Sequence, residues 1–139
     1  GDFVLADGTS LSYQDNSVDC ILSLGTTVHD QDWKNLIKEA FRVCSKQLLF
    51  DIRLTSLNTI NSLELGYVLD ESSVKYPYIV INYHELISFL GSIDCLETLK
   101  VYGYWGEANE DTTLPKGYES ICMACVLLKK NKHVDKKYF

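Results

Sequence analysis

The first third of the sequence holds the side chains most suited to chemistry. His29 could act as a general base, because the unperturbed pKa of histidine lies near neutrality. An equal alternative is that His29 is a packing or helix-entry residue. His29-Asp30-Gln31-Asp32 superficially resembles a cluster of metal ligands. We expect no metal, because Asp32 is placed to cap a helix and no further ligands are apparent.

Two short apolar stretches each end in a residue through which the backbone could meet a ligand. Residues 3–6 run into Asp7 and Gly8, and residues 20–24 run into Gly25. An ionised carboxylate only accepts hydrogen bonds, and glycine lets the backbone come close to a ligand. The pattern favours two strands with a binding site at their ends, although Asp7-Gly8 could also be a simple turn.

Five cysteines are present, and Cys122 and Cys125 have the spacing of a metal-binding knuckle. In a strand, however, residues three apart point to opposite faces, and no second pair supplies the other ligands of a tetrahedral site. The odd, irregular set also argues against a disulfide framework and favours the reducing cytoplasm.

Apolar periodicity predicts a strand-helix-strand unit in the first half. Residues 19–24 and 47–52 are apolar on both faces, as in central parallel strands. Helical spacing relates the apolar positions between them, which are Trp33, Leu36, Ile37, Ala40, Phe41 and Cys44.

The second half predicts one more helix and a closing hairpin. Asn82, followed by Glu85, is typical of a capped helix start, and Gly91 of its end. The expected inner face consists of Tyr83, Leu86, Ile87 and Leu90. Residues 98–105 and 119–128 are expected to pair antiparallel across a loop at 106–118, whereas residues 53–80 are expected to form a long loop.

This order of elements resembles the second half of the class I S-adenosylmethionine-dependent methyltransferases, of the type often labelled methyltransferase type 11. Glu39-Ala40-Phe41-Arg42-Val43 resembles the family's Glu-x-x-Arg-Val before its fifth strand. The usual Pro-Gly-Gly after it is replaced by Ser45-Lys46-Gln47, and the usual Leu-Pro-Phe by Leu11-Ser12-Tyr13. The family's glycine-rich G-x-G-x-G loop does not occur in the 139 residues.

The resemblance implies an α/β fold over residues 1–139: a Rossmann-like, three-layer methyltransferase fold that is incomplete, with a mostly parallel sheet ending in an antiparallel hairpin. It implies that residues 1–139 form the C-terminal, acceptor-side part of one domain. The missing cofactor-binding part would be about 60 residues, at ~30 residues for each strand-helix-strand unit.

The resemblance also implies the site. Asp7 would accept a hydrogen bond from the adenine amino group of S-adenosylmethionine, and the Gly8 N–H would meet the adenine ring. The backbone of Ser23, Leu24 and Gly25 would face the methionine end, and residues 26–30, among them the candidate catalytic base His29, would face the methyl group or its acceptor. The expected acceptor contacts are Thr26, Arg53, Tyr76, Tyr83 and Trp105.

The expected function is S-adenosylmethionine-dependent methyl transfer to a small-molecule acceptor once the full domain is present. The alternatives are a non-catalytic binding or assembly module of the same fold, or an unrelated doubly wound domain. A net charge of −6 disfavours nucleic acid as a partner, and the apolar runs are too short to cross a membrane. In the family, the first two strands lie between the third and the fourth. Residues 20–24 should therefore form a bare sheet edge, covered by a second copy in a homodimer or by the N-terminal strand.

Overall fold

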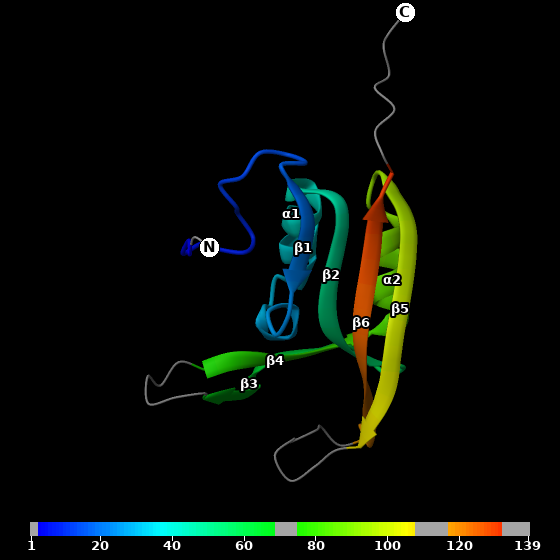
Figure 1. The fold of residues 1–139 in the computed structure, drawn as a ribbon. Coiled ribbons are helices and arrows are strands. Elements are labelled where there is room, and N and C mark those ends of the chain that lie inside the picture. Colours follow the sequence, from blue (N-terminus) through cyan, green and yellow to red (C-terminus); the bar gives the residue numbers. More distant parts are fainter. Residues whose placement is uncertain (1–2, 69–74, 108–116, 132–139) are drawn as a thin grey trace, which may run out of the picture.

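The computed structural model describes residues 3–68, 75–107 and 117–131. In chain order its elements are β1 (Val18–Ser23), the 3₁₀ turn η1 (Thr27–His29), α1 (Trp33–Val43), β2 (Cys44–Thr55), β3 (Ile60–Val68), β4 (Lys75–Asn82), α2 (Tyr83–Gly91), β5 (Leu96–Glu107) and β6 (Ser120–Lys130) (Figure 1). Most of the expected loop at 106–118 lies outside the described residues. Neither helix in the described part is long and apolar enough to cross a bilayer.

β2 is the strand around which the sheet is organised. β1 runs parallel to its first half, with Leu22 opposite Leu49, and β4 runs parallel to its end, with Leu54 opposite Ile81. On the other side β6 pairs antiparallel with β2, and β5 pairs antiparallel with β6. The predicted strand-helix-strand unit and the closing antiparallel pair are therefore confirmed.

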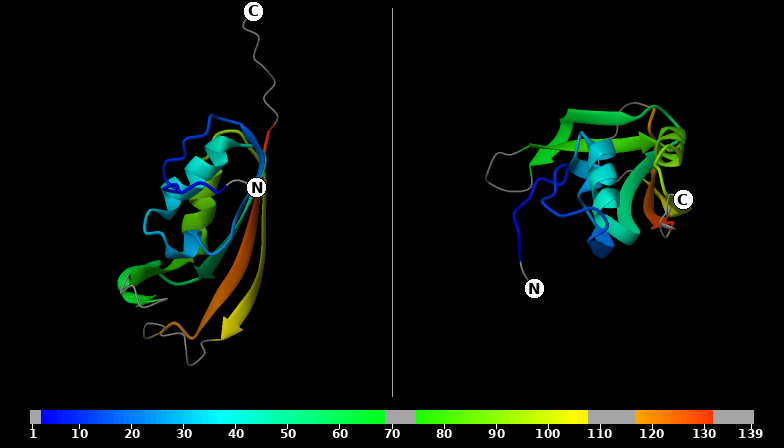
Figure 2. Two further views of the ribbon diagram at one scale, coloured as in Figure 1. Left: turned by 60° about the vertical axis from the view of Figure 1, so that its left-hand side comes forward. Right: turned by 90° about the horizontal axis from the view of Figure 1, so that it is seen from above.

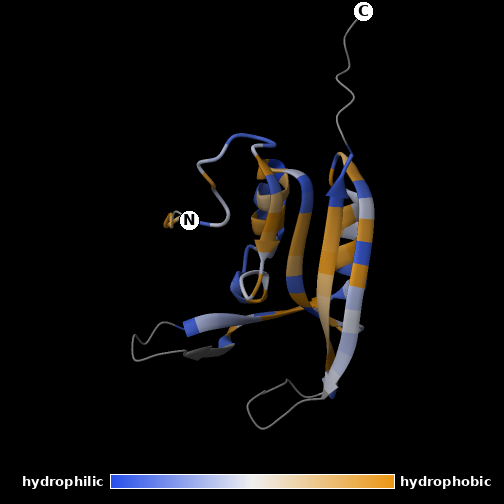
Figure 3. Cartoon of the chain, in the orientation of Figure 1, coloured by the Kyte–Doolittle hydropathy of each residue, from blue (hydrophilic) through white to orange (hydrophobic). Residues whose placement is uncertain are grey.

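Both helices lie on one face of this open sheet (Figures 1 and 2). Side chains alternate across a strand, so Leu48, Phe50 and Ile52 of β2 point to the helices and are fully buried. They pack with Ile37 and Phe41 of α1 and with Leu86 and Leu90 of α2 in the main core. Hydrophobic residues continue along β1, β2 and β6 (Figure 3). The fold is the expected α/β type, and in the described part its helices form one layer.

The two predicted helix starts differ in how they are capped. Asn82 caps α2 as expected, because its side-chain oxygen accepts the backbone N–H groups of His84 and Glu85. Asp32 stands at the N-cap of α1, but its carboxylate makes no capping bond and instead accepts the side-chain amide of Asn35. The carbonyl of Asp32 accepts the backbone N–H groups of Asn35 and Leu36, which are the ordinary first hydrogen bonds of the helix.

The expected inner face of α2 is only half correct. Leu86 and Leu90 are fully buried, whereas Tyr83 and Ile87 are 42% and 43% exposed. α2 is short, and Phe89, one residue before Leu90, packs against the core instead.

The prediction of a long loop at 53–80 is wrong. β2 continues to Thr55, and β3 and β4 then form an antiparallel hairpin. Tyr78, Val80 and Ile60 are buried with Ile121 in a second, smaller core. The β-branched and aromatic composition of residues 76–81 is the sequence signal for this strand, and burial between two parts of the sheet stabilises it.

The predicted strand at residues 3–6 is also wrong. This stretch has no regular structure, and Phe3 and Leu5 are fully exposed. Among the described residues β1 pairs only with β2, and its Leu22 is 61% exposed. The N-terminal segment therefore does not cover the edge of β1. Coverage by a second copy stays a prediction.

Candidate functional site

The turn that follows β1 is held by an acidic residue of the neighbouring strand. Gly25 adopts a left-handed conformation with φ of +68°, and its N–H donates a 2.8 Å hydrogen bond to Asp51 Oδ1. Apart from Gly25 and its two neighbours in the chain, no atom of the described residues lies within 4 Å of the place where a Cβ on Gly25 would sit. The carboxyl end of β1 therefore presents open space bounded by backbone, which is where open α/β sheets bind ligands.

The 3₁₀ turn η1 comes next and packs into the protein. Thr27 and Val28 are buried, and the Val28 carbonyl lies 3.5 Å from Nη1 of Arg53. The Thr27 hydroxyl has no hydrogen-bond partner among the described residues. A buried hydroxyl without a partner costs free energy, so this position is a candidate for contact with a bound molecule or water.

His29 ends η1 and is half-buried between β2 and β4. Its Nδ1 lies 3.3 Å from the carbonyl of Pro77, which can only accept, so Nδ1 carries the proton. The other ring nitrogen, Nε2, then has the lone pair of the neutral imidazole. Burial is the largest cause that lowers the pKa of His29, and the positive charge of Arg53 adds to it. The imidazole is therefore neutral at pH 7, the form that a general base needs.

Arg53 comes from β2, two residues after Asp51 and on the same side of the strand. Its guanidinium lies 4.8 Å from the centre of the Tyr78 ring, a distance at which a cation and an aromatic face attract. The ring of Tyr76 meets the His29 ring edge-on at 6.3 Å. η1, β2 and β4 thus bring a neutral imidazole, a guanidinium and an aromatic ring close together.

Thr26, another predicted acceptor contact, lies in the turn itself. Its hydroxyl is 3.4 Å from the Leu24 carbonyl, and the residue is exposed. The structure therefore gathers Ser23, Leu24, Gly25, Thr26, His29, Arg53 and Tyr76 at or near the carboxyl end of β1.

Asp7 and Gly8 lie in a separate turn that packs on α1. The Asp7 carboxylate accepts the backbone N–H and the hydroxyl of Thr9, which lower its pKa below the usual value. A Cβ on Gly8 would come within 3.3 Å of Leu36 Cδ1, a tight contact that would require the Leu36 side chain to shift by a few tenths of an ångström. Asp7 and Gly8 therefore have the conformation of a turn, which was the alternative that the sequence left open.

Two of the predicted acceptor contacts stand apart from this cluster. Tyr83 begins α2, is exposed, and stacks on His84 with ring centres 3.8 Å apart. Trp105 lies on β5, where it is paired with Cys122 of β6, and it is 65% exposed. β6 separates β5 from β2 in the sheet. Neither residue has a contact with His29 or Arg53 among those found in the described part of the chain.

Sequence reasoning missed Asp51, and it included Thr27 only as part of the expected acceptor-facing residues 26–30. The signal for Asp51 was present, because an acidic residue interrupts the apolar run of β2. Thr27 gave no such signal, since threonine is common both inside and outside proteins. The two cysteines with knuckle spacing lie on opposite sides of β6: Cys122 packs against the core and Cys125 is exposed. No group of three or more potential metal ligands occurs in the described residues.

The chain is similar in sequence and in fold to known methyltransferases. Residues 1–49 match the family model of the methyltransferase domain. Solved structures with a similar fold include an S-adenosylmethionine-dependent methyltransferase from Methanosarcina mazei, at 16% identity and a TM-score of 0.54 over 95% of this chain and 68% of that one. The chain has a methyltransferase fold. No curated protein sequence matches it.

Two further structures share this methyltransferase fold. The 4+2 cyclase SpnF matches at 13% identity with a TM-score of 0.59, over 95% of this chain and 56% of that one. An S-adenosylmethionine-dependent methyltransferase from Thermotoga maritima matches at 16% identity with a TM-score of 0.50, over 93% of this chain and 64% of that one. The chain thus spans between 56% and 68% of the length of these three structures.

The residues present fit two ends of S-adenosylmethionine. The exposed Asp7 carboxylate has lone pairs for further donors, as an adenine amino group requires. The turn at Gly25 has open space where the backbone is accessible. The glycine-rich G-x-G-x-G pattern does not occur in this sequence, so the fit covers only part of the cofactor.

Proposed function

We propose that this chain serves S-adenosylmethionine-dependent methyl transfer to a small-molecule acceptor, as the acceptor side and part of the cofactor side of a methyltransferase domain. The observation that carries the proposal is the cluster at the carboxyl end of β1. A glycine turn held by Asp51 lies beside a neutral, half-buried His29. The family match supports the proposal. It covers residues 1–49, which include the glycine turn and His29 but not Asp51.

Bound S-adenosylmethionine supplies an electrophilic methyl group, so the protein's task is alignment of the acceptor and exclusion of water. In this proposal Asp7 and Gly8 bind the adenine, and the backbone at Ser23, Leu24 and Gly25 binds the methionine end. Because Nδ1 of His29 is engaged with the Pro77 carbonyl, Nε2 is the atom that takes the proton from the acceptor. When the acceptor atom bonds to the methyl carbon, the bond from that carbon to sulfur breaks and a neutral thioether leaves, and the proton that the acceptor releases passes to the Nε2 lone pair.

Arg53 and Tyr76 are proposed to bind the acceptor beside His29. A guanidinium can bind a carboxylate or phosphate on the acceptor in bidentate fashion, and an aromatic ring offers apolar area. We place Thr26 at the mouth of the same site. Tyr83 and Trp105 are also proposed as acceptor contacts, from positions on α2 and β5 that stand apart from this cluster. Within the described residues the cysteines form no disulfide bond, which is compatible with a reaction in the cytoplasm.

The fold does not by itself fix the reaction, since one structure with this fold is titled a 4+2 cyclase. The test is therefore a binding experiment on the chain itself. Backbone amide NMR spectra would be recorded while S-adenosylmethionine is added to millimolar concentration, with adenosine and methionine added separately as controls. We expect S-adenosylmethionine to shift Gly8, Gly25 and Thr26, adenosine to shift only Gly8, and methionine to shift only Gly25 and Thr26.

Absence of any shift at these amides with S-adenosylmethionine would overturn the proposed function for this chain. An Asp7→Ala variant sharpens the result. It should abolish the adenosine response while leaving the methionine response and the fold unchanged, because Asp7 is exposed and outside the core.

A further inference from the structure

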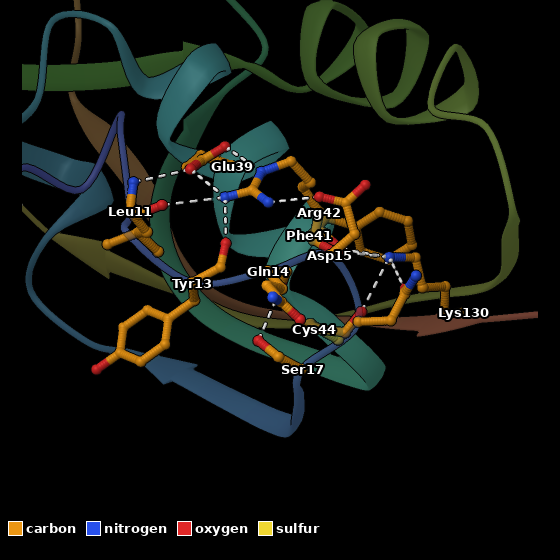
Figure 4. Close-up of polar contacts among 11 residues, drawn as sticks. Leu11, Tyr13, Gln14, Asp15, Ser17, Glu39, Phe41, Arg42, Cys44 and Lys130 are labelled. Carbon is orange, nitrogen blue, oxygen red and sulfur yellow. Dashed lines mark hydrogen bonds and ion pairs between the residues drawn. The ribbon is translucent and has the colours of Figure 1, made fainter.

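We propose that Glu39 and Arg42 of α1 are positioning residues, which hold residues 7–15 so that Asp7 and Gly8 can receive the adenine of S-adenosylmethionine. The inference rests on the proposed function and adds to it two residues that do not touch the ligand. Its basis is the set of bonds that Arg42 makes to the segment before β1 (Figure 4).

Arg42 forms an ion pair with Glu39 through two of its nitrogens. Nε donates to Glu39 Oε2 at 2.8 Å and Nη2 to Oε1 at 2.7 Å. This bidentate arrangement fixes the plane of the guanidinium. It also holds the pKa of Glu39 to about 2, with the hydrogen bonds from Arg42 as the largest cause. The carboxylate is therefore charged over the whole physiological range.

The same two side chains bind the segment before β1 at three residues. Nη2 of Arg42 donates to the carbonyls of Leu11 and Tyr13, at 3.1 and 2.9 Å, and Nη1 donates to the Asp15 carboxylate. Glu39 Oε1 accepts the N–H of Leu11 at 2.8 Å. Leu11 is thus held through both its N–H and its carbonyl, a backbone pairing made by two side chains instead of by a strand.

This attachment lies directly after the turn that carries Asp7. The Ser10 N–H donates to the Asp7 carbonyl at 3.1 Å and closes the turn, and Leu11 is the next residue. Residues 3–6 have no regular structure, so the turn has no support from a strand before it. Its position therefore depends on Leu36 beneath Gly8 and on the Glu39–Arg42 pair behind Leu11.

Lysine cannot replace arginine in this role, because an ammonium lacks the planar fork that reaches Glu39 and two carbonyls at once. The Arg42→Lys variant keeps the charge and tests the geometry alone. The matched control is Lys46→Gln, which breaks another exposed ion pair, to Asp19, and touches none of residues 7–15. A second variant, Glu39→Gln, keeps the shape of the side chain in case Arg42→Lys does not fold.

The experiment is the same amide NMR titration with S-adenosylmethionine, with hydrogen exchange of Leu11 measured alongside. For wild type and Lys46→Gln we expect shifts at Gly8 and at Gly25. For Arg42→Lys and Glu39→Gln we expect the shift at Gly8 to disappear and the one at Gly25 to remain. The apparent dissociation constant should rise about tenfold, as when one hydrogen bond to a charged group is lost. Leu11 should also exchange faster.

The outcomes separate this inference from the proposed function. No shift in the wild type rejects the proposed function, and the positioning role with it. A wild type that shifts at Gly8, together with both variants shifting there equally, rejects the positioning role alone. A purely structural role would weaken the shifts at Gly8 and Gly25 alike, and that result would also overturn the inference.

Discussion

Gly25 and Asp51 are joined by a 2.8 Å hydrogen bond that ties the end of β1 to the middle of β2. They are far apart in sequence, yet the parallel register that sets Ser23 opposite Phe50 places the following turn beside the Asp51 carboxylate. The bond supports a left-handed glycine conformation at the point where the candidate site opens.

The turn at Gly25 should resist a side chain for conformational reasons alone. Gly25→Ala is expected to destabilise the protein by about 1–2 kcal/mol, the cost of a left-handed conformation for an L-residue, because no neighbouring atom would clash. Gly91→Ala, at the end of α2 where there is also open space and no positive φ, is the matched control. It should be neutral or slightly stabilising in urea unfolding. Equal effects of the two substitutions would contradict this explanation.

The chain alone should bind S-adenosylmethionine weakly and transfer no methyl group. It lacks the glycine-rich loop and the ribose-binding acid, and each missing hydrogen bond to a charged group removes ~1.5–3 kcal/mol. Isothermal titration calorimetry on the 139-residue chain measures this directly. A micromolar dissociation constant would show that the residues present suffice.

Stability should fall in mild acid because of His29. Its pKa is lowered in the folded protein, so the unfolded chain takes up the proton first as the pH drops through the ordinary value of 6.5. Folding free energy is therefore lost from about that pH down to the lower pKa of the folded state. Across this pH range, the free energy of unfolding measured in urea should fall less steeply with pH for His29→Gln than for wild type. The same pH dependence in both proteins would assign the loss to other groups.

Glu39 should matter at neutral pH and cease to matter in strong acid. Its pKa falls from 4.5 to about 2 on folding, so its contribution is present above pH 4.5 and is lost as the pH falls toward 2. For Glu39→Gln we expect a loss of about 1 kcal/mol at pH 7, since the pair with Arg42 is accessible to solvent. The difference from wild type should shrink in acid unfolding curves. A constant difference at every pH would mean that packing, not charge, is lost.

The bare edge of β1 should make the chain associate with itself. We expect concentration-dependent dimers in sedimentation velocity, because an edge that is unpaired among the described residues and carries the exposed Leu22 can extend its sheet with a second copy. Leu22→Lys should abolish them, while Ile87→Lys, on an exposed position of α2, should not. A protein that stays monomeric at all concentrations would contradict this prediction.

Local patterns in the sequence determined most of the elements. The spacing of Ile37, Ala40 and Phe41 predicts α1, and Asn82 predicts the start of α2, because such signals act within one or two turns of chain. The apolar runs of β1, β2 and β6 and their directions also follow from the sequence, since a helix between strands implies parallel pairing and its absence implies antiparallel pairing. His29 and the turn at Gly25 could likewise be singled out as candidates.

Tertiary structure alone decided the rest. The β3–β4 hairpin depends on burial of Tyr78 and Val80 against Ile121, and residues 3–6 form no strand because they have no neighbouring strand to pair with among the described residues. Which acid supports Gly25, and which side chain of α1 holds Leu11, are questions of distance between segments remote in sequence. No local pattern records such distances, because they arise only when the sheet register and the packing of α1 bring the segments together.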